Sequence, residues 1–182
     1  MTTGDELGAM IDGLVRDIPD FPKPGVMFKD ITPLLDDHEG FTAVVQALAD
    51  AGRDETGAPV VDKVIGMEAR GFILAAPVAL ALGVGFVPVR KPGKLPAATY
   101  SVSYTLEYGE ETLEMHTDAV AAGERVLLVD DVLATGGTAA ATAQLVEKCG
   151  ATVHGVAVLM ELAFLHGRDL LGDLPLTSLR IL

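Results

Sequence analysis

The segment 125–138 constrains the fold of this chain more than any other, and its sequence is RVLLVDDVLATGGT. Its apolar run, Val126–Val129, fits a β-strand that is covered on both faces. Asp130 and Asp131 follow that run directly, and open α/β sheets bind their ligands at the carboxyl ends of parallel strands. The segment therefore predicts a buried strand that brings two carboxylates to the ligand-binding edge of a sheet.

The turn after the two acids has the composition of an anion site. Gly136 and Gly137 let the backbone come close to a phosphate, and the hydroxyls of Thr135 and Thr138 can donate hydrogen bonds to it. The predicted helix after the turn directs its free N–H groups and the positive end of its dipole to the same place. We therefore predict that Ala134, Thr135, Gly136, Gly137 and Thr138 bind a phosphate group.

Two adjacent carboxylates would repel a phosphate held against them, so Asp130 and Asp131 need another partner. They can accept hydrogen bonds from the paired hydroxyls of a ribose or reach a divalent cation. The predicted ligand is then a ribose 5-phosphate. A P-loop nucleotidase also carries acids after a buried strand, but it needs the pattern G-x-x-x-x-G-K-[ST], which this chain lacks. A strand, turn and helix with a purely structural role is the other alternative.

Two further segments have features of anion sites. Residues 90–94, RKPGK, place three cations within five residues of a chain whose net charge is −13. We expect them to bind a local anion rather than a polymer, although a solvated loop can have the same composition. The turn Glu68-Ala69-Arg70-Gly71 follows a predicted strand and opens a predicted helix. It is therefore a second predicted anion site, with Arg70 as its natural ligand.

Composition predicts one domain over residues 1–182, since the chain is 49% hydrophobic and has no composition break. The net charge of −13 opposes broad contact with nucleic acid or anionic lipid, so neither is expected as a partner. No uncharged apolar run reaches about 18 residues, and the N-terminus lacks the basic start of a secretory signal, so we expect a cytoplasmic protein. Cys149 is the only cysteine, which excludes an intrachain disulfide.

Hydrophobic periodicity predicts that helices and strands alternate along the chain. Helices are predicted near residues 4–17, 38–53, 71–82 and 137–149, and strands near 63–67, 84–89, 125–130, 152–160 and the C-terminus. This order predicts an α/β fold with a mainly parallel sheet flanked by helices on both faces.

Two segments depart from that alternation. Residues 99–107 and 111–116 alternate polar and apolar side chains around a Tyr108-Gly109-Glu110 turn, which predicts a hairpin that acts as a mobile flap over the carboxyl ends of the strands. Residues 18–33 contain too many prolines for a helix, so we expect a rigid extended loop that closes the site.

These segments together resemble a known family. The segment 125–138 is similar to the loop that binds phosphoribosyl diphosphate (PRPP) in the type I phosphoribosyltransferases. The Pro-rich run 18–33 closely resembles the signature of the adenine phosphoribosyltransferases within that family. Residues 66–72, 90–96 and 104–109 match the same family, so the resemblance covers nearly the whole chain.

The resemblance implies that the phosphoribosyl group of PRPP is transferred to N9 of adenine, giving AMP and diphosphate in purine salvage. It also implies a homodimer and the cofactor Mg²⁺, carried by PRPP rather than by a direct protein ligand. The implied site residues are Asp130, Asp131 and 134–138 for PRPP and AMP; Glu68, Ala69, Arg70, Arg90, Lys91 and Lys94 for diphosphate; Met27, Phe28, Lys29 and Leu159 for adenine; and Glu107 and Asp131 for catalysis, with Tyr108 of the flap excluding water.

The resemblance places adenine between the Phe28 ring and the apolar region around Leu159, with the backbone at Met27 and Lys29 reading its edge. A backbone C=O can accept from the 6-amino group while an N–H donates to N1, and a 6-oxopurine reverses that pattern. Lys29 stands where arginine is common in the family, and Pro92 occupies a position that is often basic.

Four alternatives stay open for this interpretation. Glu107 can be an ordinary charged residue of a hairpin, and residues 18–33 can be a structural arm. A salvage enzyme for a 6-oxopurine is disfavoured by the Pro-rich signature. A transcription regulator that senses PRPP would need a DNA-binding domain or a basic face.

Overall fold

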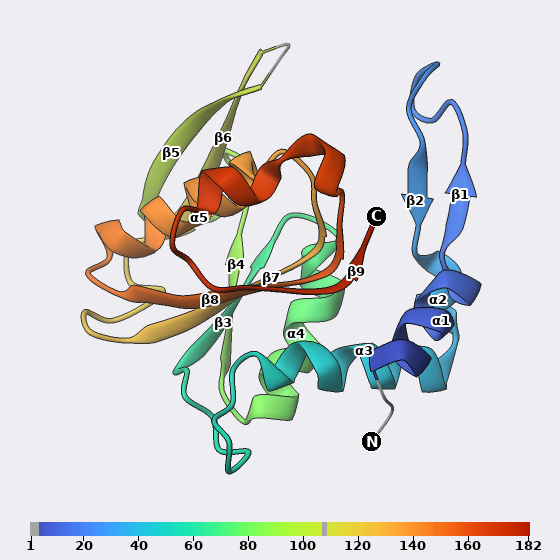
Figure 1. The fold of residues 1–182 in the computed structure, drawn as a ribbon. Coiled ribbons are helices and arrows are strands. Elements are labelled where there is room, and N and C mark those ends of the chain that lie inside the picture. The colour runs from blue at the N-terminus through green and yellow to red at the C-terminus, as the bar shows by residue number, and fades with distance from the viewer. Residues whose placement is uncertain (1–3, 107–108) are drawn as a thin grey trace.

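A five-stranded parallel sheet forms the centre of the molecule (Figure 1). The computed structural model describes residues 4–106 and 109–182. The strands of the sheet are β3 (Lys63–Met67), β4 (Gly85–Val89), β7 (Arg125–Leu133), β8 (Thr152–Glu161) and β9 (Leu176–Ile181). Their order is β4-β3-β7-β8-β9 and every neighbouring pair is parallel, so the predicted sheet is confirmed with β7 at its centre.

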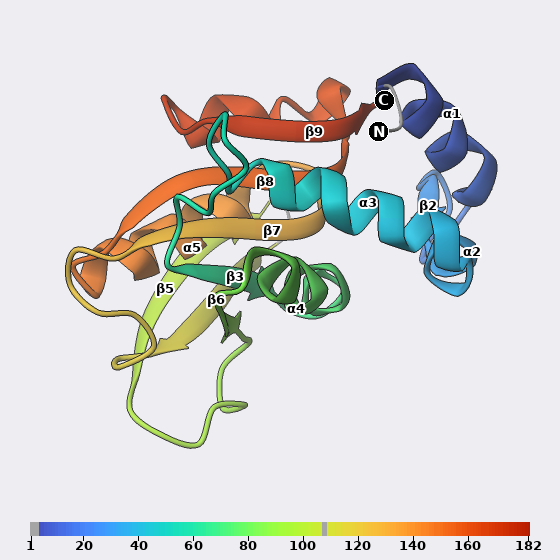
Figure 2. The ribbon, with the colours of Figure 1, turned by 90° about the horizontal axis from the view of Figure 1, so that it is seen from below.

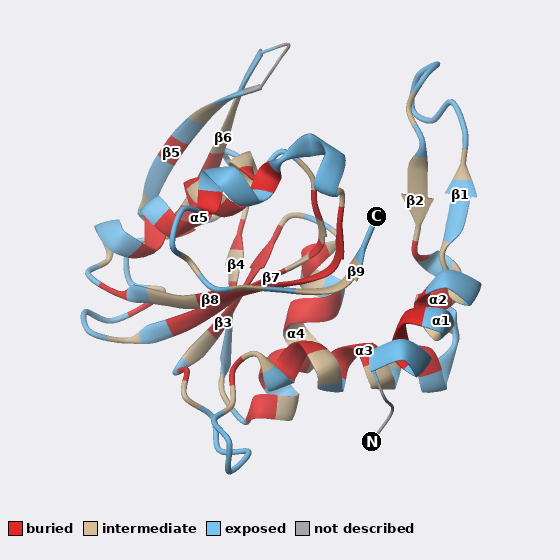
Figure 3. Ribbon diagram, in the orientation of Figure 1, coloured by how far each residue is buried: buried red, intermediate tan, exposed pale blue. Residues whose placement is uncertain are grey.

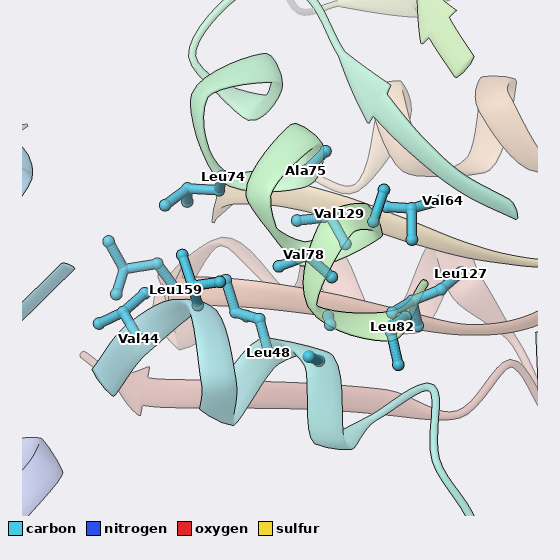
Figure 4. Close-up of a cluster of buried hydrophobic side chains, with 14 of the residues drawn as sticks. Val44, Leu48, Val64, Leu74, Ala75, Val78, Leu82, Leu127, Val129 and Leu159 are labelled. Carbon is cyan, nitrogen blue, oxygen red and sulfur yellow. The ribbon is translucent and has the colours of Figure 1, made fainter. Parts of the chain in front are cut away.

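Alternation of side chains along β7 explains how both faces of the sheet are covered. Leu127 and Val129 point to one face, where α3 (His38–Asp50) and α4 (Gly71–Leu82) pack (Figure 4). Val126 and Leu128 point to the other face, where α5 (Gly137–Lys148) packs. Successive side chains of a strand point to opposite faces, so all four apolar residues of this run are fully buried.

The predicted hairpin is present and packs on the same face as α5. Its strands are β5 (Thr99–Leu106) and β6 (Gly109–His116), and they pair antiparallel. Val102, Leu113 and Met115 bury their side chains in the cluster that includes α5. The hairpin is therefore anchored at its base, and Figure 1 shows it extending away from the sheet beyond α5.

The N-terminal elements lie at one end of the sheet (Figure 2). They are α1 (Gly4–Leu14), β1 (Arg16–Ile18), β2 (Phe28–Asp30) and α2 (Thr32–Asp36). The strands β1 and β2 form a separate antiparallel pair. Arg180 of β9 binds both carboxylate oxygens of Asp12 at 2.8 and 2.7 Å, which ties α1 to the edge of the sheet.

Several element boundaries differ from the sequence prediction. Residues 18–33 are not extended throughout, because Pro33 lies in the first turn of α2, where its missing N–H costs no hydrogen bond. The strand predicted to end at Asp130 continues to Leu133, since β8 keeps pairing with it up to Glu161. Two short 3₁₀ helices, η1 (Ala163–Leu165) and η2 (Gly167–Leu171), were not predicted.

Buried residues concentrate in the sheet and on the helix surfaces that face it (Figure 3). Within residues 4–106 and 109–182, no helix combines the length and the apolar character that crossing a membrane requires.

Candidate active site

A cavity of about 470 Å³ opens at the carboxyl ends of β3 and β7. Such a volume suits a small-molecule ligand. Its lining residues are Val26, Met27, Phe28, Lys29, Glu68, Ala69, Arg70, Asp130, Asp131, Val132, Ala134, Thr138, Leu162 and Leu165. The fold thus brings together the predicted base segment, the Glu68 turn, the acid pair and the start of the phosphate turn, which are far apart in the sequence.

The predicted phosphate turn surrounds a second, smaller hollow of about 70 Å³ at the N-terminus of α5. Gly136 has a φ of 85°, and a Cβ there would lie 2.3 Å from the carbonyl oxygen of Gly167 in η2. A Cβ on Gly137 would lie 2.7 Å from the ring of Tyr104. Packing against these two neighbours therefore requires both glycines, apart from any contact that they make with a phosphate.

The two acids lie within β7 and differ in their surroundings. Asp131 is 4% exposed, and the Nε of Arg70 approaches its Oδ2 to 2.8 Å without the alignment of a hydrogen bond. Asp130 opens partly to the cavity, and its Oδ1 accepts from the N–H of Asp131 at 2.8 Å. Burial and the neighbouring negative charge of Asp131 raise the pKa of Asp130 well above its usual range. The ionised form of Asp130 is therefore energetically disfavoured at this position.

Arg70, predicted to bind diphosphate, lies between the base segment and the acids. Its guanidinium carbon is 4.9 Å from the centre of the Phe28 ring, and its Nη1 is 3.5 Å from the carbonyl oxygen of Lys29. Together with the approach to Asp131, these contacts place its charge at the wall of the cavity, between the base segment and the acids. None of these contacts is with the basic loop, residues 90–94.

Glu68 binds two cations of the basic loop, Arg90 and Lys94, and the backbone of the third, Lys91. Its carboxylate accepts from Arg90 Nε at 3.2 Å and from the backbone N–H of Lys91 at 2.9 Å, and it binds the ammonium of Lys94. Burial opposes its ionisation, but these contacts outweigh burial and lower the pKa of Glu68. The structure therefore brings Glu68 to the predicted diphosphate residues as a counter-ion that fixes their positions. The peptide bond from Glu68 to Ala69 is cis.

The predicted adenine segment forms part of the cavity wall. Met27, Phe28 and Lys29 all contribute to its wall, and Phe21 packs edge-on against Phe28 with 5.0 Å between ring centres. The strand β2 pairs with β1 along one edge only. Backbone groups on its other edge are therefore free of strand pairing and can meet a ligand.

Leu159 is not at this wall, which corrects the sequence prediction. It is fully buried in the cluster beneath α3 and α4, as Figure 4 shows. It is not among the residues that line the cavity. Val132, Leu162 and Leu165 supply the apolar surface instead.

Two predicted residues, Glu107 and Tyr108, lie outside the residues that the structure describes. Elsewhere on the hairpin, the sequence prediction missed Tyr104, whose hydroxyl lies 2.9 Å from Oγ1 of Thr138. The predicted hairpin could have indicated this contact. Tyr104 lies on its first strand, before the predicted turn, and it reaches α5 when the hairpin folds over that helix. Among the described side chains, no three His, Cys, Asp or Glu residues are grouped so that they could hold a metal ion.

Comparison with known proteins agrees with this geometry. A family model described as a phosphoribosyl transferase domain matches residues 34–169. The chain is 74% identical over 166 residues to an adenine phosphoribosyltransferase from a Nocardioides species, covering 91% of this chain and 90% of that protein. It is 60% identical over 171 residues to one from a Parafrankia species, covering 94% and 91%.

Solved structures give the same result. The crystal structure of adenine phosphoribosyltransferase from Thermoanaerobacter pseudethanolicus matches with a TM-score of 0.90 and 50% identity, covering 99% of this chain and 100% of that chain. The enzyme from Saccharomyces cerevisiae, solved with adenine and an imino-altritol bisphosphate, matches with a TM-score of 0.90 and 37% identity, covering 96% and 99%.

Proposed function

This chain belongs to the adenine phosphoribosyltransferase family, and we propose that its cavity transfers the phosphoribosyl group of PRPP to N9 of adenine. The products are AMP and diphosphate, and the reaction serves purine salvage. One observation carries the proposal: one cavity is lined by residues of the phosphate turn, two carboxylates, an arginine and the strand β2, with the rest of the turn around the smaller hollow. These are the groups that PRPP and a purine base need.

Charge determines how PRPP lies in the cavity. The 5′-phosphate fits the turn 134–138, where N–H groups and hydroxyls meet the N-terminus of α5. The ribose hydroxyls then donate to Asp130 and Asp131, and the diphosphate lies toward the cations of the basic loop. In this orientation neither carboxylate faces a phosphate group directly.

The backbone of β2 selects the base in this proposal. Phe28 stacks on the purine, which adds affinity with little selectivity because every base has an aromatic face. Backbone C=O and N–H groups at Met27 and Lys29 read the 6-amino group and N1. Lys29 can therefore replace an arginine, because the side chain does not read the base; here its ammonium pairs with Asp17 at 2.6 Å.

Magnesium fits the acid pair. The Oδ2 atom of Asp131 is buried and receives no aligned hydrogen bond, and Asp130 lies beside it, so the charge of this pair would favour a cation carried by PRPP next to them. When bound, the ion neutralises charge on the departing diphosphate. The protein's own residues hold the ribose, and the base attacks C1′ from the face opposite the diphosphate as oxocarbenium character develops.

Acid–base and lid roles are assigned to the hairpin by the family resemblance. We propose Glu107 as the acid or base near the imidazole ring of adenine and Tyr108 as the residue that excludes water. We also propose that the protein acts in the cytoplasm; its single cysteine allows no intrachain disulfide, which fits a reducing compartment.

We propose that the active species is a homodimer formed through α4. Ile73 and Leu80 are 44% and 82% exposed and are seven residues apart, so they share one face of this helix. Phe86 of the edge strand β4 is exposed as well. Leu80→Glu should give a monomer by light scattering, whereas a wild-type protein that is fully active as a monomer at assay concentration would reject the dimer.

The decisive assay measures AMP formation from PRPP, magnesium and either adenine or hypoxanthine. We expect kcat/KM to favour adenine by a factor on the order of 10⁴, because a mismatched base leaves buried polar groups unpaired. Lys29→Ala should keep this preference because it keeps the backbone N–H, whereas Lys29→Pro should reduce it. Comparable use of hypoxanthine by the wild type would favour a 6-oxopurine enzyme and reject the assignment.

A further inference from the structure

A chain of polar contacts crosses the hairpin from Thr138 of the phosphate turn to Lys91 of the basic loop. Tyr104 and Glu111 are directly opposite each other on β5 and β6, so their side chains lie on the same face of the hairpin. The Tyr104 hydroxyl donates to Oε2 of Glu111 at 2.9 Å, and it lies 2.9 Å from the hydroxyl of Thr138. Oε1 of Glu111 accepts from Nζ of Lys91 at 3.2 Å.

Proton count fixes the direction of this chain. The Tyr104 hydroxyl has one proton, and a carboxylate can only accept, so that proton goes to Glu111. The hydroxyl of Thr138 must then donate to the oxygen of Tyr104. The carboxylate of Glu111 therefore receives one hydrogen bond from the hairpin itself and one from Lys91 of the basic loop.

Packing fixes the position of the Tyr104 side chain. Its ring packs where a side chain at position 137 would stand, and its body is part of the cluster beneath α5. Glu111, by contrast, is 37% exposed and Lys91 is 51% exposed in their side chains, so their ion pair is the exchangeable contact of the chain. A pair of this kind is weak enough for a multiply charged ligand to displace.

We propose that Glu111 and Tyr104 are positioning residues that set how readily Lys91 is available to the diphosphate. Glu111 competes with the diphosphate for the ammonium of Lys91. Tyr104 weakens that competition, because its hydrogen bond satisfies part of the charge of Glu111. The inference rests on the proposed function in one respect only, that Lys91 binds the diphosphate.

Two substitutions should change diphosphate affinity in opposite directions. Glu111→Gln keeps an acceptor for Tyr104 but releases Lys91, so diphosphate should bind more tightly. An exposed ion pair contributes up to about 1 kcal/mol, so the dissociation constant should fall by up to about fivefold. Tyr104→Phe removes the competing hydrogen bond, so Glu111 holds Lys91 more strongly and diphosphate should bind roughly twofold more weakly.

The test is calorimetric titration of diphosphate with magnesium into the full-length wild type, both single variants and the double variant. Because Tyr104 acts through Glu111, Tyr104→Phe should have no effect once Glu111 is glutamine. Lys91→Ala should likewise abolish the effect of Glu111→Gln. Glu110→Gln is the matched control, since it makes the same charge change on the opposite face of the hairpin.

Three results would overturn the inference. They are unchanged or weaker binding in Glu111→Gln, an equal gain in Glu110→Gln, and a loss in Tyr104→Phe that persists in the double variant. A purely structural role would weaken binding in both single variants rather than give opposite signs. Binding does not require turnover, so AMP formation by the same wild-type preparation tests the proposed function separately.

Discussion

The two regions that would hold the anions, the phosphate turn at one end of the proposed site and the basic loop at the other, are built differently. At the phosphate turn, the donors are backbone N–H groups and hydroxyls, and Gly136 is fixed by close packing against Gly167. At the basic loop, the donors are cationic side chains, and the carboxylates of Glu68 and Glu111 bind them. Packing therefore holds one end, and exchangeable ion pairs hold the other.

This difference fits the chemistry of the two anions. The 5′-phosphate stays attached to the ribose from PRPP to AMP, so a rigid site formed before binding serves it throughout. The diphosphate must leave, and cations that already have carboxylate partners can return to them when it does. We expect the phosphate turn to be sensitive to packing and the basic loop to be sensitive to charge.

The largest effect is expected between the two ends, at the acid pair. Asp130→Asn combined with Asp131→Asn should lower kcat/KM for PRPP by about 10²–10⁴, because each lost hydrogen bond to a charged group costs about 1.5–3 kcal/mol. Steady-state kinetics give this number, and circular dichroism should show an intact fold. Unchanged kinetics with PRPP would refute the ribose assignment.

The single variant Asp130→Asn should be more stable than the wild type. The folded-state pKa of Asp130 is raised by burial and by Asp131, so the neutral form favours folding at low pH and this benefit is lost as the pH rises through the raised pKa. Asparagine stays neutral. Its Tm advantage should therefore grow from pH 4 to pH 8, by about 2–4 °C for each kcal/mol, and a constant difference would contradict the charge argument.

A pair of glycine variants compares the two ends directly. Gly136 and Gly93 have φ values of 85° and 76°, but a Cβ at Gly93 would meet open space. Alanine at either position carries about 1–2 kcal/mol of backbone strain, and only Gly136→Ala adds a clash with Gly167. Urea unfolding and PRPP kinetics should show the larger loss, roughly 10–100-fold in kcat/KM, for Gly136→Ala. Equal losses would contradict the packing account.

Arg168 follows Gly167, which packs against the phosphate turn, so we expect the contacts of Arg168 to stabilise the turn as well. Arg168 binds both oxygens of Glu161 at 3.0 and 2.6 Å, and Glu161 also accepts from Ser178 at 2.6 Å. Arg168→Met should cost about 1–3 kcal/mol of stability and raise the KM for PRPP a few-fold. A variant with normal stability and a normal KM would show that η2 does not support the turn.

The pH dependence of the Tm of Arg168→Met provides a control for the preceding prediction. The contact with Arg168 lowers the pKa of Glu161, so its stabilisation is present above the usual carboxyl range and is lost as the pH falls through the lowered value. The Tm difference between wild type and Arg168→Met should therefore shrink on acidification.

Salt should give the smallest effect. Raising the ionic strength to about 1 M shortens the screening length to about 3 Å, which weakens contacts between exposed charges most. Diphosphate affinity should fall a few-fold more than ribose 5-phosphate affinity, because Lys91 and Lys94 are about half exposed. Titration of both ligands at two salt concentrations measures this, and equal losses would contradict the difference between the ends.

Local sequence patterns were sufficient where one property dominated. The apolar runs of β3 and α4 were predicted with their observed bounds, 63–67 and 71–82. In segment 125–138 both acids line the larger cavity, and both glycines line the smaller hollow at the start of the helix. In these segments periodicity and turn chemistry indicate the same structure, so no knowledge of neighbouring elements was needed.

Predictions that depended on packing were less successful. Leu159 belongs to a strand that is buried on both faces, so its apolar neighbours give no signal of which face it joins. The contacts of Arg70 with Phe28 and Asp131 depend on three elements meeting. The role of Glu68 as a counter-ion required the basic loop to fold back on its turn.

A crystal structure of the protein with PRPP and magnesium, without adenine, tests the central claim most directly. We predict the 5′-phosphate on the turn 134–138 with that backbone unchanged, and the diphosphate on the basic loop. Lys91 and Lys94 should have left Glu111 and Glu68 to bind it. A 5′-phosphate on the basic loop, or a phosphate turn that must rearrange while Lys91 and Lys94 keep their carboxylate partners, would contradict the account.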